Sequence, residues 1–490
     1  MLVAAKARAM LFSRHNPPTA TINSLSAKRL SNARNLTHTR KISQRPDIAK
    51  SVIEKPRLDF KGIAENADYH AQNLRNRKIP KGQGLVEELK EVHKRYMELR
   101  TEVIQARTEQ NIIGKKIKST QNPQERRQAI NTAAELKNFL AVQEPLADAT
   151  EATLLELGLQ IPNITHPNSP IGPEALANVL SKHGPEPLQA DIRRDHWTIA
   201  KQLDIIRFEE AATTTGSFWY FLRGAAALLE QALINYSLST AIKHGYTPIS
   251  TPDVVKADIA SRCGFSPRDA VDVNGKKVNH LYHLEETSND LVLTGTAEIP
   301  LAGMFTHKTF FEKELPQRLV GVGHAFRSEA GSRGAMTRGL YRVHQFTKVE
   351  LFALTEQKQS EAMMEEIRQL QIQIFEGLGF PFRVLDMPTE ELGHAAYRKY
   401  DIEAWMPGRD GQLELKNKAL PFAHTLNGTA AAIPRLIIAL LENGVVLNDA
   451  GQPVGIRLPS TLRPFWFGEE RLGPYTPIHW FDPTITTQTT

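Results

Sequence analysis

Apolar and small residues recur at alternating spacings of four and three between Leu85 and Ile117. This spacing, held for more than four heptads, predicts a long helix with one apolar seam, as in a coiled coil. Gln110 fills the single seam position that is neither apolar nor small. The other seam positions are Leu85, Leu89, Val92, Tyr96, Leu99, Val103, Ala106, Ile113 and Ile117.

A second seam runs through residues 124–157 and predicts a second long helix. Between the two stretches, Asn122 and Pro123 suit a tight reversal of the chain. Two long helices joined by so short a connection form an antiparallel hairpin. Pro145 interrupts the second stretch, so we expect a kink or a break there. The second seam comprises Ala129, Ala133, Leu136, Leu140, Ala147, Leu154 and Leu157.

The segment after the hairpin, residues 158–187, is rich in Pro and Asn and predicts a linker. We therefore divide the chain into an N-terminal segment over 1–46, a helical arm over 47–165, a linker over 166–190 and a large domain over 191–490. The length of 490 residues with 41% apolar content fits two or three domains plus a tail. The single Cys263 excludes a disulfide framework and any zinc site built from several cysteines. No apolar run reaches the ~20 residues of a membrane helix.

The first 46 residues differ in composition from the rest of the chain. They are rich in Ser, Thr and Asn, and no acidic residue precedes Asp47. This composition predicts a mitochondrial transit peptide, with a basic arm that binds nucleic acid as the alternative. Lys6 cuts the only leading apolar stretch, which disfavours a secretory signal. The basic residues of this segment are Lys6, Arg8, Arg14, Lys28, Arg29, Arg34, Arg40, Lys41 and Arg45.

Removal of this segment would change the sign of the formal net charge. The whole chain carries 60 Lys and Arg against 54 Asp and Glu, a formal net charge of +6. Without the nine basic residues above, 51 remain against 54, which gives about −3. The charge of the whole chain therefore does not by itself indicate nucleic-acid binding.

The charge of the helical arm is more informative. Residues 75–137 hold 15 Lys or Arg against 8 Glu. Five of these basic residues lie close to the connection between the two helices, at the tip of the hairpin. A basic tip suits a phosphate backbone, whereas a dimerisation coiled coil with solvated charges is the alternative. The tip residues are Lys115, Lys116, Lys118, Arg126 and Arg127.

Candidate chemistry gathers in the run from Phe326 to Glu350, FRSEAGSRGAMTRGLYRVHQFTKVE. Arg327 and Glu329 are two residues apart, so on a strand they would point into the same pocket. A Gly-rich basic turn follows, and Phe346 comes after it. The guanidinium suits a phosphate or carboxylate, the carboxylate can accept from an exocyclic amine, and the aromatic ring can stack on a base. The run predicts a nucleotide site, with an ordinary charged hairpin as the alternative.

Two further segments carry polar residues at helix starts. Leu293–Pro300, LTGTAEIP, predicts a capped helix start with Thr296 as the cap and Glu298 near the first turn. His424–Asn443, HTLNGTAAAIPRLIIALLEN, predicts a strand, a turn and a helix that carries Arg435. A helical arginine of this kind could equally be a surface residue.

These motifs resemble those of the class II aminoacyl-tRNA synthetases, and in detail those of the seryl-tRNA synthetase family. RSEAG followed by RGLYRVHQF resembles motif 2, and HTLNGTAAAIPRLII resembles motif 3. Lys243–Pro252, KHGYTPISTP, resembles motif 1, whose proline, here Pro252, helps to build a dimer interface. The resemblance extends from about Asp59 onward. It implies an α+β fold: an N-terminal antiparallel helical hairpin and a catalytic domain on a mainly antiparallel β-sheet.

The resemblance also implies an activity and its partners. The expected enzyme is a serine–tRNA ligase that activates L-serine with ATP and Mg2+ and transfers it to tRNA(Ser), as a homodimer in the mitochondrial matrix. Arg327 and Arg435 are the expected catalytic residues, and Lys115, Lys116, Arg126 and Arg127 are expected to bind tRNA. The expected ATP-binding residues are Arg327, Ser328, Glu329, Val343, His344, Gln345, Phe346 and Arg435. The expected serine-binding residues are Thr296, Ala297, Glu298, Arg327, Glu350 and Thr429.

One segment departs from the family pattern. Before motif 3 the family has an EISS element and then SNCxDxQxRR, whereas this chain has only DGQLELKNKALPFA between Asp410 and Ala423. Glu414 alone could stand for the family's metal-binding glutamate. An omitted exon or a splice variant explains the short segment more simply than adaptive loss. The departure favours, as the alternative function, a catalytically impaired or silent synthetase-like protein that binds tRNA. Threonyl- or prolyl-tRNA synthetase is disfavoured because only 55 residues follow Arg435.

Overall fold

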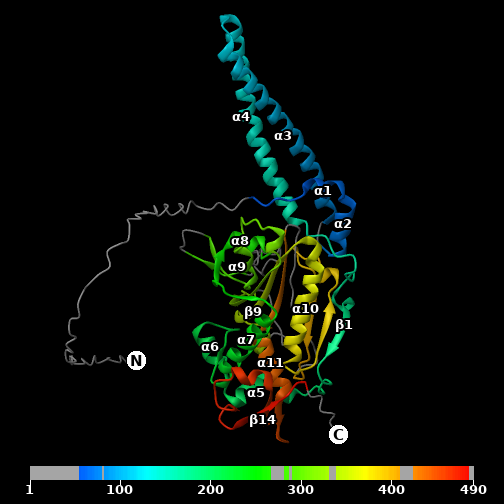
Figure 1. The fold of residues 1–490 in the computed structure, drawn as a ribbon, viewed down its shortest axis with the longest axis vertical. Coiled ribbons are helices and arrows are strands. Elements are labelled where there is room, and N and C mark those ends of the chain that lie inside the picture. The colour runs from blue at the N-terminus through cyan, green and yellow to red at the C-terminus, as the bar shows by residue number, and fades with distance from the viewer. Residues whose placement is uncertain are drawn as a thin grey trace, which may run out of the picture. The chain divides into compact units, whose positions relative to one another are not determined.

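The computed structural model describes residues 55–79, 82–265, 281–285, 290–329, 338–408 and 423–484. The fold is α+β, as predicted, with a long helical arm and a domain built on β-sheets (Figure 1). The expected transit peptide and the metal-binding candidate Glu414 lie outside the described residues. Among the described residues, no helix is both long enough and apolar enough to cross a membrane.

The arm consists of the paired helices α3 (Gly82–Ser119) and α4 (Pro123–Gln160), which run side by side in Figure 1. Seam residues such as Leu89, Leu99 and Leu154 are fully buried, which confirms the predicted hairpin. Asn122 caps α4, because its side-chain oxygen accepts a hydrogen bond from the Gln124 backbone N–H at 3.0 Å. Of the kink or break expected at Pro145, the break does not occur, since α4 continues through this residue. Two short helices precede the arm, α1 (Phe60–Glu65) and α2 (Ala67–Asn76).

Arg77, directly after α2, is buried and joins the arm to the rest of the domain. Its guanidinium donates to the Gly393 carbonyl at 3.0 Å, to the Ala396 carbonyl and to the Thr165 hydroxyl at 2.9 Å. Burial lowers the pKa of Arg77 to about 10. Since a buried guanidinium is stable only when its donors are satisfied, these carbonyls fix where the root of the arm attaches.

The central sheet has the strand order β12-β9-β8-β4. Its strands are β12 (His424–Ala432), β9 (Gln345–Thr355), β8 (Gln317–Phe326) and β4 (Thr247–Ser250). β9 pairs antiparallel with both β8 and β12, whereas β4 joins β8 in parallel. The β8–β9 pair carries the two halves of motif 2, and β4 follows α7 within motif 1. In this register Glu350 on β9 lies opposite Gly321 on one side and Thr429 on the other.

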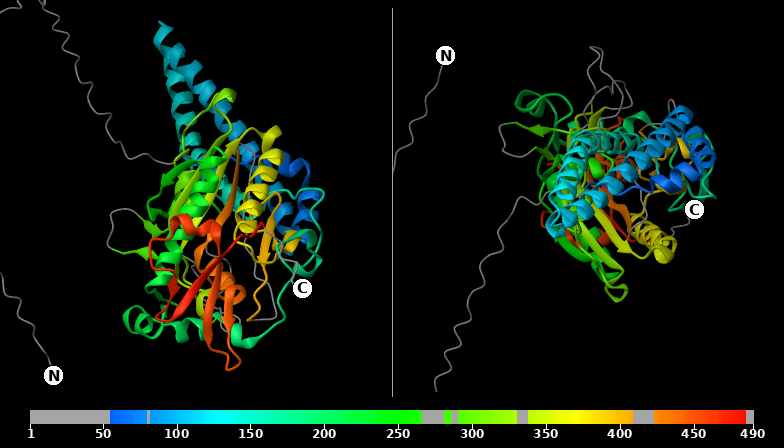
Figure 2. Two further views of the ribbon diagram at one scale, coloured as in Figure 1. Left: turned by 60° about the horizontal axis from the view of Figure 1, so that its bottom comes forward. Right: turned by 90° about the horizontal axis from the view of Figure 1, so that it is seen from above.

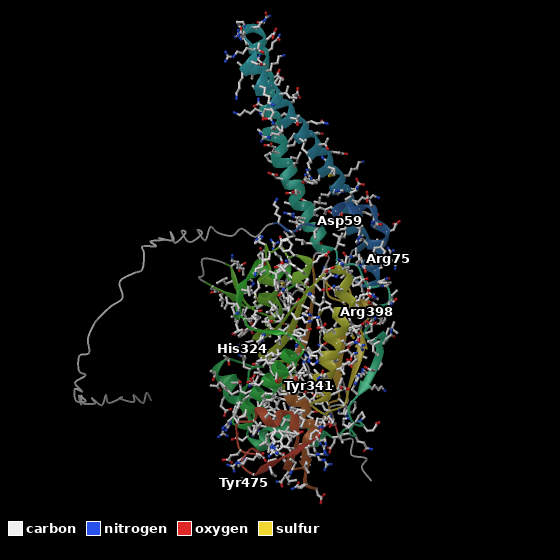
Figure 3. The ribbon with its side chains drawn as sticks, viewed as in Figure 1. Asp59, Arg75, His324, Tyr341, Arg398 and Tyr475 are labelled. Atoms are coloured by element: carbon white, nitrogen blue, oxygen red, sulfur yellow. The ribbon has the colours of Figure 1, made fainter. Side chains whose placement is uncertain are left out.

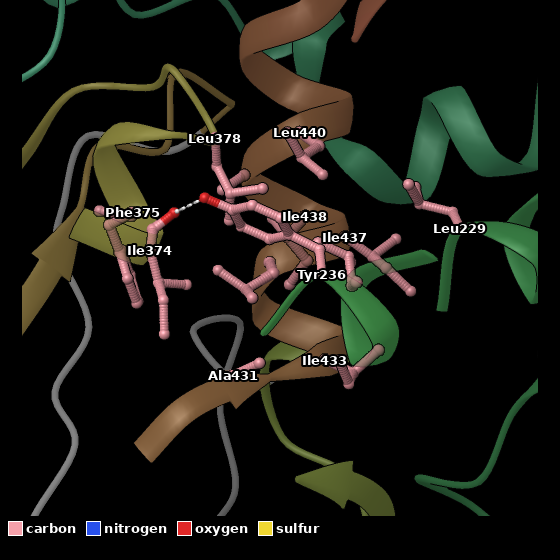
Figure 4. Packing of buried hydrophobic residues seen from close by; sticks show 14 of the residues in the cluster. Leu229, Tyr236, Ile374, Phe375, Leu378, Ala431, Ile433, Ile437, Ile438 and Leu440 are labelled. Atoms are coloured by element: carbon pink, nitrogen blue, oxygen red, sulfur yellow. Dashed lines mark hydrogen bonds between the residues drawn. The ribbon is translucent and has the colours of Figure 1, made fainter. Parts of the chain in front are cut away.

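Three helices bury the core on this sheet: α7 (Ala225–Lys243), α10 (Ser360–Glu376) and α11 (Ile433–Gly444). Figure 4 shows Leu229 of α7 and Ile437 of α11 within this apolar cluster. The Tyr236 hydroxyl donates to the Ile374 carbonyl at 3.1 Å, so its polar end is satisfied inside the core. α11 follows β12 directly, without the predicted turn, and Pro434 stands in its first turn, where a missing N–H costs nothing.

Smaller sheets surround the centre. The orders are β1-β10-β11, β13-β14-β16-β15, β5-β7-β6 and β2-β3, and the orange to red C-terminal strands come forward in Figure 2. β1 (Asn178–His183) pairs with β10 (Phe382–Asp386), so part of the expected linker over 166–190 is a sheet strand. The remaining elements are β2 (Ile206–Arg207), β3 (Phe221–Leu222), β5 (Val254–Lys256), β6 (His283–Leu284), β7 (Leu291–Leu293), β11 (Tyr400–Ala404), β13 (Val445–Leu447), β14 (Pro453–Pro459), β15 (Arg471–Leu472), β16 (Thr476–Phe481), α5 (His196–Leu203), α6 (Glu209–Thr214), α8 (Ala257–Arg262) and α9 (Glu298–Gly303).

Candidate active site

Arg327 follows the last residue of β8, and its backbone N–H donates to the His344 carbonyl at 2.9 Å. Glu329, two residues later, has a left-handed backbone with φ of 47°. The expectation that both side chains project from one strand is therefore wrong, because the strand ends at Phe326 and the chain turns. A glutamate held in this conformation is strained by of order 1 kcal/mol, and such strain gathers at functional sites.

The Arg327 guanidinium lies over an aromatic ring and among carboxylates. Its carbon is 5.4 Å from the centre of the Phe346 ring, and its Nε donates to the Gly295 carbonyl at 3.3 Å. Burial lowers the pKa of Arg327, and the negative charges of Glu329 and Glu350 offset part of that effect. The structure thus brings the predicted arginine and the predicted stacking aromatic together at one site.

Glu329 forms an ion pair with Arg342, a residue that the sequence analysis did not single out. The Arg342 Nε donates to a carboxylate oxygen of Glu329, and the glutamate side chain is only 13% exposed. Arg342 lies three residues before β9, in the second half of motif 2. An adenine amine could bind this carboxylate only by sharing it with Arg342 or by displacing that pair.

Arg435, in the first turn of α11, adds a further positive charge to the site. Burial, and after it the charge of Arg327, lower the pKa of Arg435 to about 10; Glu329 partly offsets this shift, and Arg342 adds a smaller lowering. Three guanidinium groups therefore act on one another across this site. A polyanionic ligand would relieve their repulsion, and phosphates suit guanidinium groups in particular.

His344 anchors the segment that leads into β9. Its Nδ1 lies 2.9 Å from the Arg327 carbonyl and 2.8 Å from the Tyr282 hydroxyl, and its ring stacks on Trp219 with 5.6 Å between centres. The neighbouring Val343 is buried, and Gln345 lies opposite Phe326 in the β8–β9 ladder. Ser328 is half-buried beside them. These predicted ATP-site residues thus surround Arg327, although only some of them expose side chains.

A cluster of polar side chains from β9, β12 and the start of α9 lies next to Arg327. Lys348 donates to the Thr296 hydroxyl at 3.1 Å, and its ammonium is 2.6 Å from Glu350 Oε2. Asn427 on β12 donates to Glu350 at 2.9 Å and to Glu298 at 3.2 Å. The structure therefore brings the predicted Thr296, Glu298 and Glu350 together. The predicted Thr429 completes the group, with its hydroxyl donating to Glu350 Oε2 at 3.5 Å.

Thr296 does not cap a helix, contrary to the sequence expectation. α9 begins at Glu298, the cap position is Ala297, and the Thr296 hydroxyl accepts from Lys348 instead. Ala297 packs with Leu301 and Phe352 and closes the apolar side of the cluster. A Cβ at Gly323 would lie 2.8 Å from the Thr251 hydroxyl oxygen, so a side chain there would displace Thr251, whereas the Ala297 Cβ at 3.5 Å is in ordinary contact.

Sequence reasoning missed Lys348 and Asn427, although a signal for both was present. Lys348 alternates with the predicted Phe346 and Glu350 along β9, so the three share one face. Asn427 stands in the same relation to Thr429 on β12. The alternation rule that was applied to Arg327 and Glu329 would have found both residues.

A cavity of about 470 Å³ runs along the outer edge of β12. Asn427 and Thr429 line it on one side, and Tyr400 and Ile402 of β11 line it on another. Within the described ranges, β12 and β11 are each the last strand of their sheet, so two strand edges border one cavity. The short segment between Asp410 and Ala423 connects these two strands in sequence, and most of it lies outside the described residues.

Among the described residues, one group has the donor set of a metal site: Asp195, His196 and Glu442, all buried. Both nitrogens of the His196 imidazole already take part in hydrogen bonds. His196 Nδ1 lies 3.0 Å from Glu442 Oε1, while Nε2 accepts from the Leu340 N–H at 3.2 Å. Both ring nitrogens are engaged in hydrogen bonds, so this group does not fit a metal ion.

The expected tRNA-binding residues lie at the tip of the arm. Lys115 and Lys116 are near the end of α3, and Arg126 and Arg127 are in the first turns of α4. All four side chains are exposed to solvent. Their positions are compatible with binding a long anionic ligand outside the domain core.

Comparisons with known proteins agree with this geometry. Residues 58–165 match the seryl-tRNA synthetase N-terminal domain, and residues 282–432 match the tRNA synthetase class II core domain (G, H, P, S and T). A serine–tRNA ligase of Rubrobacter xylanophilus is 38% identical over 438 residues, which cover 85% of this chain and 99% of that protein. The mitochondrial serine–tRNA ligase of Schizosaccharomyces pombe is 37% identical over 434 residues, which cover 83% of this chain and 88% of that protein.

Solved structures give the same result. The seryl-tRNA synthetase of Pyrococcus horikoshii, complexed with ATP, is similar with a TM-score of 0.73 and 28% identity, covering 84% of this chain and 99% of that one. The cytoplasmic serine–tRNA ligase of Naegleria fowleri, in complex with AMP, is similar with a TM-score of 0.70 and 25% identity, covering 85% of this chain and 98% of that one.

Proposed function

The chain belongs to the serine–tRNA ligase family, and from this membership we propose that it activates L-serine with ATP and transfers the seryl group to tRNA(Ser). The observation that carries the proposal is the buried polar cluster beside Arg327. It holds two carboxylates, an ammonium, an amide and two hydroxyl groups around one point of the sheet. The similarity to ligases over most of the chain does not favour the alternative of a silent tRNA-binding protein.

The cluster suits serine because the substrate carries an ammonium and a hydroxyl on a three-carbon frame. Glu298 or Glu350 can accept from the ammonium, and Thr429 can exchange hydrogen bonds with the hydroxyl. A substrate without the hydroxyl would leave buried polar groups unpaired, and sites of this kind reject such analogues strongly. The cluster would therefore discriminate serine from alanine.

Arg327 stands between the cluster and the other cationic groups. In the proposed reaction the serine carboxylate attacks the α-phosphorus of ATP, the bond to the β-phosphate oxygen breaks, and pyrophosphate leaves. Arg327 would hold the carboxylate and the α-phosphate as charge builds there, and Arg435 would hold the γ-phosphate. Phe346 would support the adenine, and the Glu329 carboxylate would accept from its amine. No protein nucleophile is needed, so positioning supplies the catalysis.

The remaining parts of the proposal concern partners. We propose that ATP binds with Mg2+, that the basic tip of the arm contacts the tRNA backbone, and that two copies pair through the elements of motif 1. Mitochondrial relatives and the basic N-terminal segment support a mitochondrial location. The metal-binding candidate, Glu414, is outside the described residues, so no described side chain is assigned to Mg2+.

An amino-acid panel tests the proposed function. Pyrophosphate exchange with the purified chain should depend on serine, and the same assay with alanine, glycine and threonine should give far lower kcat/KM. Transfer to tRNA(Ser) should follow in an aminoacylation assay. Preference for another amino acid, with serine inactive, would overturn the proposal. The variant Thr429→Ala should narrow the difference between serine and alanine, because it removes a group that alanine leaves unpaired.

A further inference from the structure

His196 is a buried histidine outside the nucleotide site, and it contacts residues 339–341, a part of motif 2 just before β9. It is the first residue of α5 and is fully buried, as is its partner Glu442 near the end of α11. Neither side chain touches a residue that is proposed to bind serine or ATP. The pair nevertheless links α11, which carries one of those residues, to residues 338–341, which lead along the chain to others.

The hydrogen bonds fix the protonation of the imidazole. Nε2 accepts from the Leu340 backbone N–H at 3.2 Å, so it carries no proton, and Nδ1 donates to Glu442 at 3.0 Å. Glu442 is held independently, because it also accepts from the His196 backbone N–H at 3.0 Å and from the Gly408 backbone N–H at 2.8 Å. The carboxylate therefore aligns the ring, and the ring aligns Leu340.

The neighbours of His196 contact the same short stretch. The Arg338 guanidinium lies 4.8 Å above the Trp197 ring and 3.9 Å from Asp195. Tyr341, labelled in Figure 3, meets the His196 ring edge to face with 5.0 Å between centres. Three consecutive residues, 195–197, thus contact residues 338–341.

Gly339 makes this approach possible. It has φ of 72°, and a Cβ at this position would lie 2.2 Å from His196 Nε2. A side chain would therefore occupy the space through which the imidazole reaches Leu340. The backbone conformation and the missing side chain both serve this one contact.

The stretch 338–341 leads directly to Arg342, which pairs with Glu329, and then to Phe346 beneath Arg327. Glu442 belongs to α11, whose first turn carries Arg435. The two sides of the cationic site are therefore connected through one imidazole. We propose that His196 is a positioning residue, which holds residues 338–341 in place relative to α11 and thereby tunes the affinity for ATP. This inference rests on the proposed function.

Two substitutions separate the two hydrogen bonds of the ring. In His196→Gln the side-chain amide reaches the place of Nε2 and can still accept from Leu340, but the contact with Glu442 is lost. In His196→Asn the amide reaches only the place of Nδ1, so it can donate to Glu442 while the Leu340 N–H is left without its acceptor. Glu442 keeps its backbone donors in both variants.

The first measurement is ATP affinity by equilibrium titration, together with the KM values for ATP and serine. His196→Asn should weaken ATP binding roughly tenfold with KM for serine nearly unchanged, whereas His196→Gln should stay within about twofold of the parent, because small misplacements near a reacting group are costly. Tyr236→Phe is the matched control, since it removes one buried hydrogen bond between α7 and α10. Equal ATP affinity for His196→Asn and this control would overturn the inference.

The second measurement does not depend on activity. Amide hydrogen exchange at Leu340 should speed up markedly in His196→Asn and stay slow in His196→Gln and Tyr236→Phe. Unchanged exchange at Leu340 in His196→Asn would show that the imidazole does not hold this stretch. A parent protein that exchanges Leu340 slowly but binds no ATP would instead count against the proposed function alone.

Discussion

The ammonium of Lys348 lies 2.6 Å from the carboxylate of Glu350, two residues along the same face of β9, and both side chains are buried. The pair lies in the centre of the sheet, where Glu350 also contacts Asn427. An ion pair in this position orients the carboxylate that is proposed to meet serine. It also makes either partner costly to remove, because the remaining charge would be buried alone.

Replacing Lys348 with Met should therefore damage stability and serine binding together. We expect the free energy of unfolding to fall by about 3 kcal/mol, as for other broken buried pairs, and KM for serine to rise, with ATP affinity retained. Urea titration and pyrophosphate exchange measure the two effects. Lys358→Met is the matched control, because Lys358 pairs with Glu356 on the surface and should leave both quantities unchanged. Normal serine kinetics in the Lys348 variant would remove this residue from the proposed pocket.

Arg435→Leu should separate stability from binding. The pKa of Arg435 is lowered to about 10 from its usual 12.5, so the folded protein holds this proton less tightly than the unfolded chain does. The cost to stability is complete below pH 10 and is relieved as the pH rises from about 10 toward 12.5. After allowance for partial exposure, we expect the leucine variant to be about 1 kcal/mol more stable at pH 8, with less gain at pH 10.5. ATP affinity should fall at least about 100-fold in the same variant. A variant that is less stable and binds ATP normally would contradict both statements.

The tip of the arm should act on tRNA alone. Replacing Lys115, Lys116, Arg126 and Arg127 with Ala should weaken tRNA(Ser) binding and reduce the slope of log K against log salt by up to about 3.6, since each phosphate contact contributes about 0.9. Serine-dependent pyrophosphate exchange should not change. A matched set nearer the root, Lys90, Lys94, Arg95 and Arg100, removes the same charge and should have a smaller effect on tRNA. Equal loss of exchange and tRNA binding in the tip variant would mean that the tip is structural.

The N-terminal segment should direct the protein to mitochondria. Residues 1–46 fused to a fluorescent protein should localise there, because a basic segment without acidic residues has the composition of a transit peptide. A fusion with the nine Lys and Arg replaced by Gln is the control and should stay diffuse. A diffuse signal from the unchanged segment would favour the alternative of a basic arm that binds nucleic acid.

The short connection between β11 and β12 should limit the rate of activation. Two strand edges border the cavity beside Asn427 and Thr429, so the serine pocket lacks a paired strand on that side in the described part of the chain. Replacing residues 410–423 with a family segment that contains EISS and SNCxDxQxRR should raise serine-dependent pyrophosphate exchange about 100-fold, the effect of correcting a misplacement of ~1 Å. Equal and robust exchange by both proteins would show that the present segment substitutes for the absent one.

The sequence predicted the parts of this fold whose signals are local. The heptad seam gave the hairpin, because seam residues repeat within a few turns of each helix. The linker prediction did not foresee β1, since this strand pairs with β10 about 200 residues away and its six residues have no strong pattern of their own. Of the kink or break expected at Pro145, the break does not occur, because packing along the whole arm keeps α4 together despite one missing hydrogen bond.

The candidate site was predicted by residue type more than by geometry. Arg327, Phe346, Glu298, Glu350 and Thr429 do meet, as the motifs implied. Arg327 and Glu329 do not share a strand face, because one residue in a left-handed conformation redirects the chain, and glutamate gives no sign of it. The network through His196 was invisible for a different reason. Its partners are separated by up to 246 residues, and only the folded chain places them together.

Gly321 and Gly323 on β8 lie opposite Glu350 and Lys348, the two charged residues of the proposed serine pocket. At these positions β8 contributes only main chain to the wall of the pocket, and the short side chains of Thr251 and Ala297 pack over it. Main chain and short packed side chains have few rotamers to lose when a ligand arrives. Part of the conformational entropy that is ordinarily lost on binding has therefore already been lost on folding. Serine would bind to a surface whose shape is already fixed.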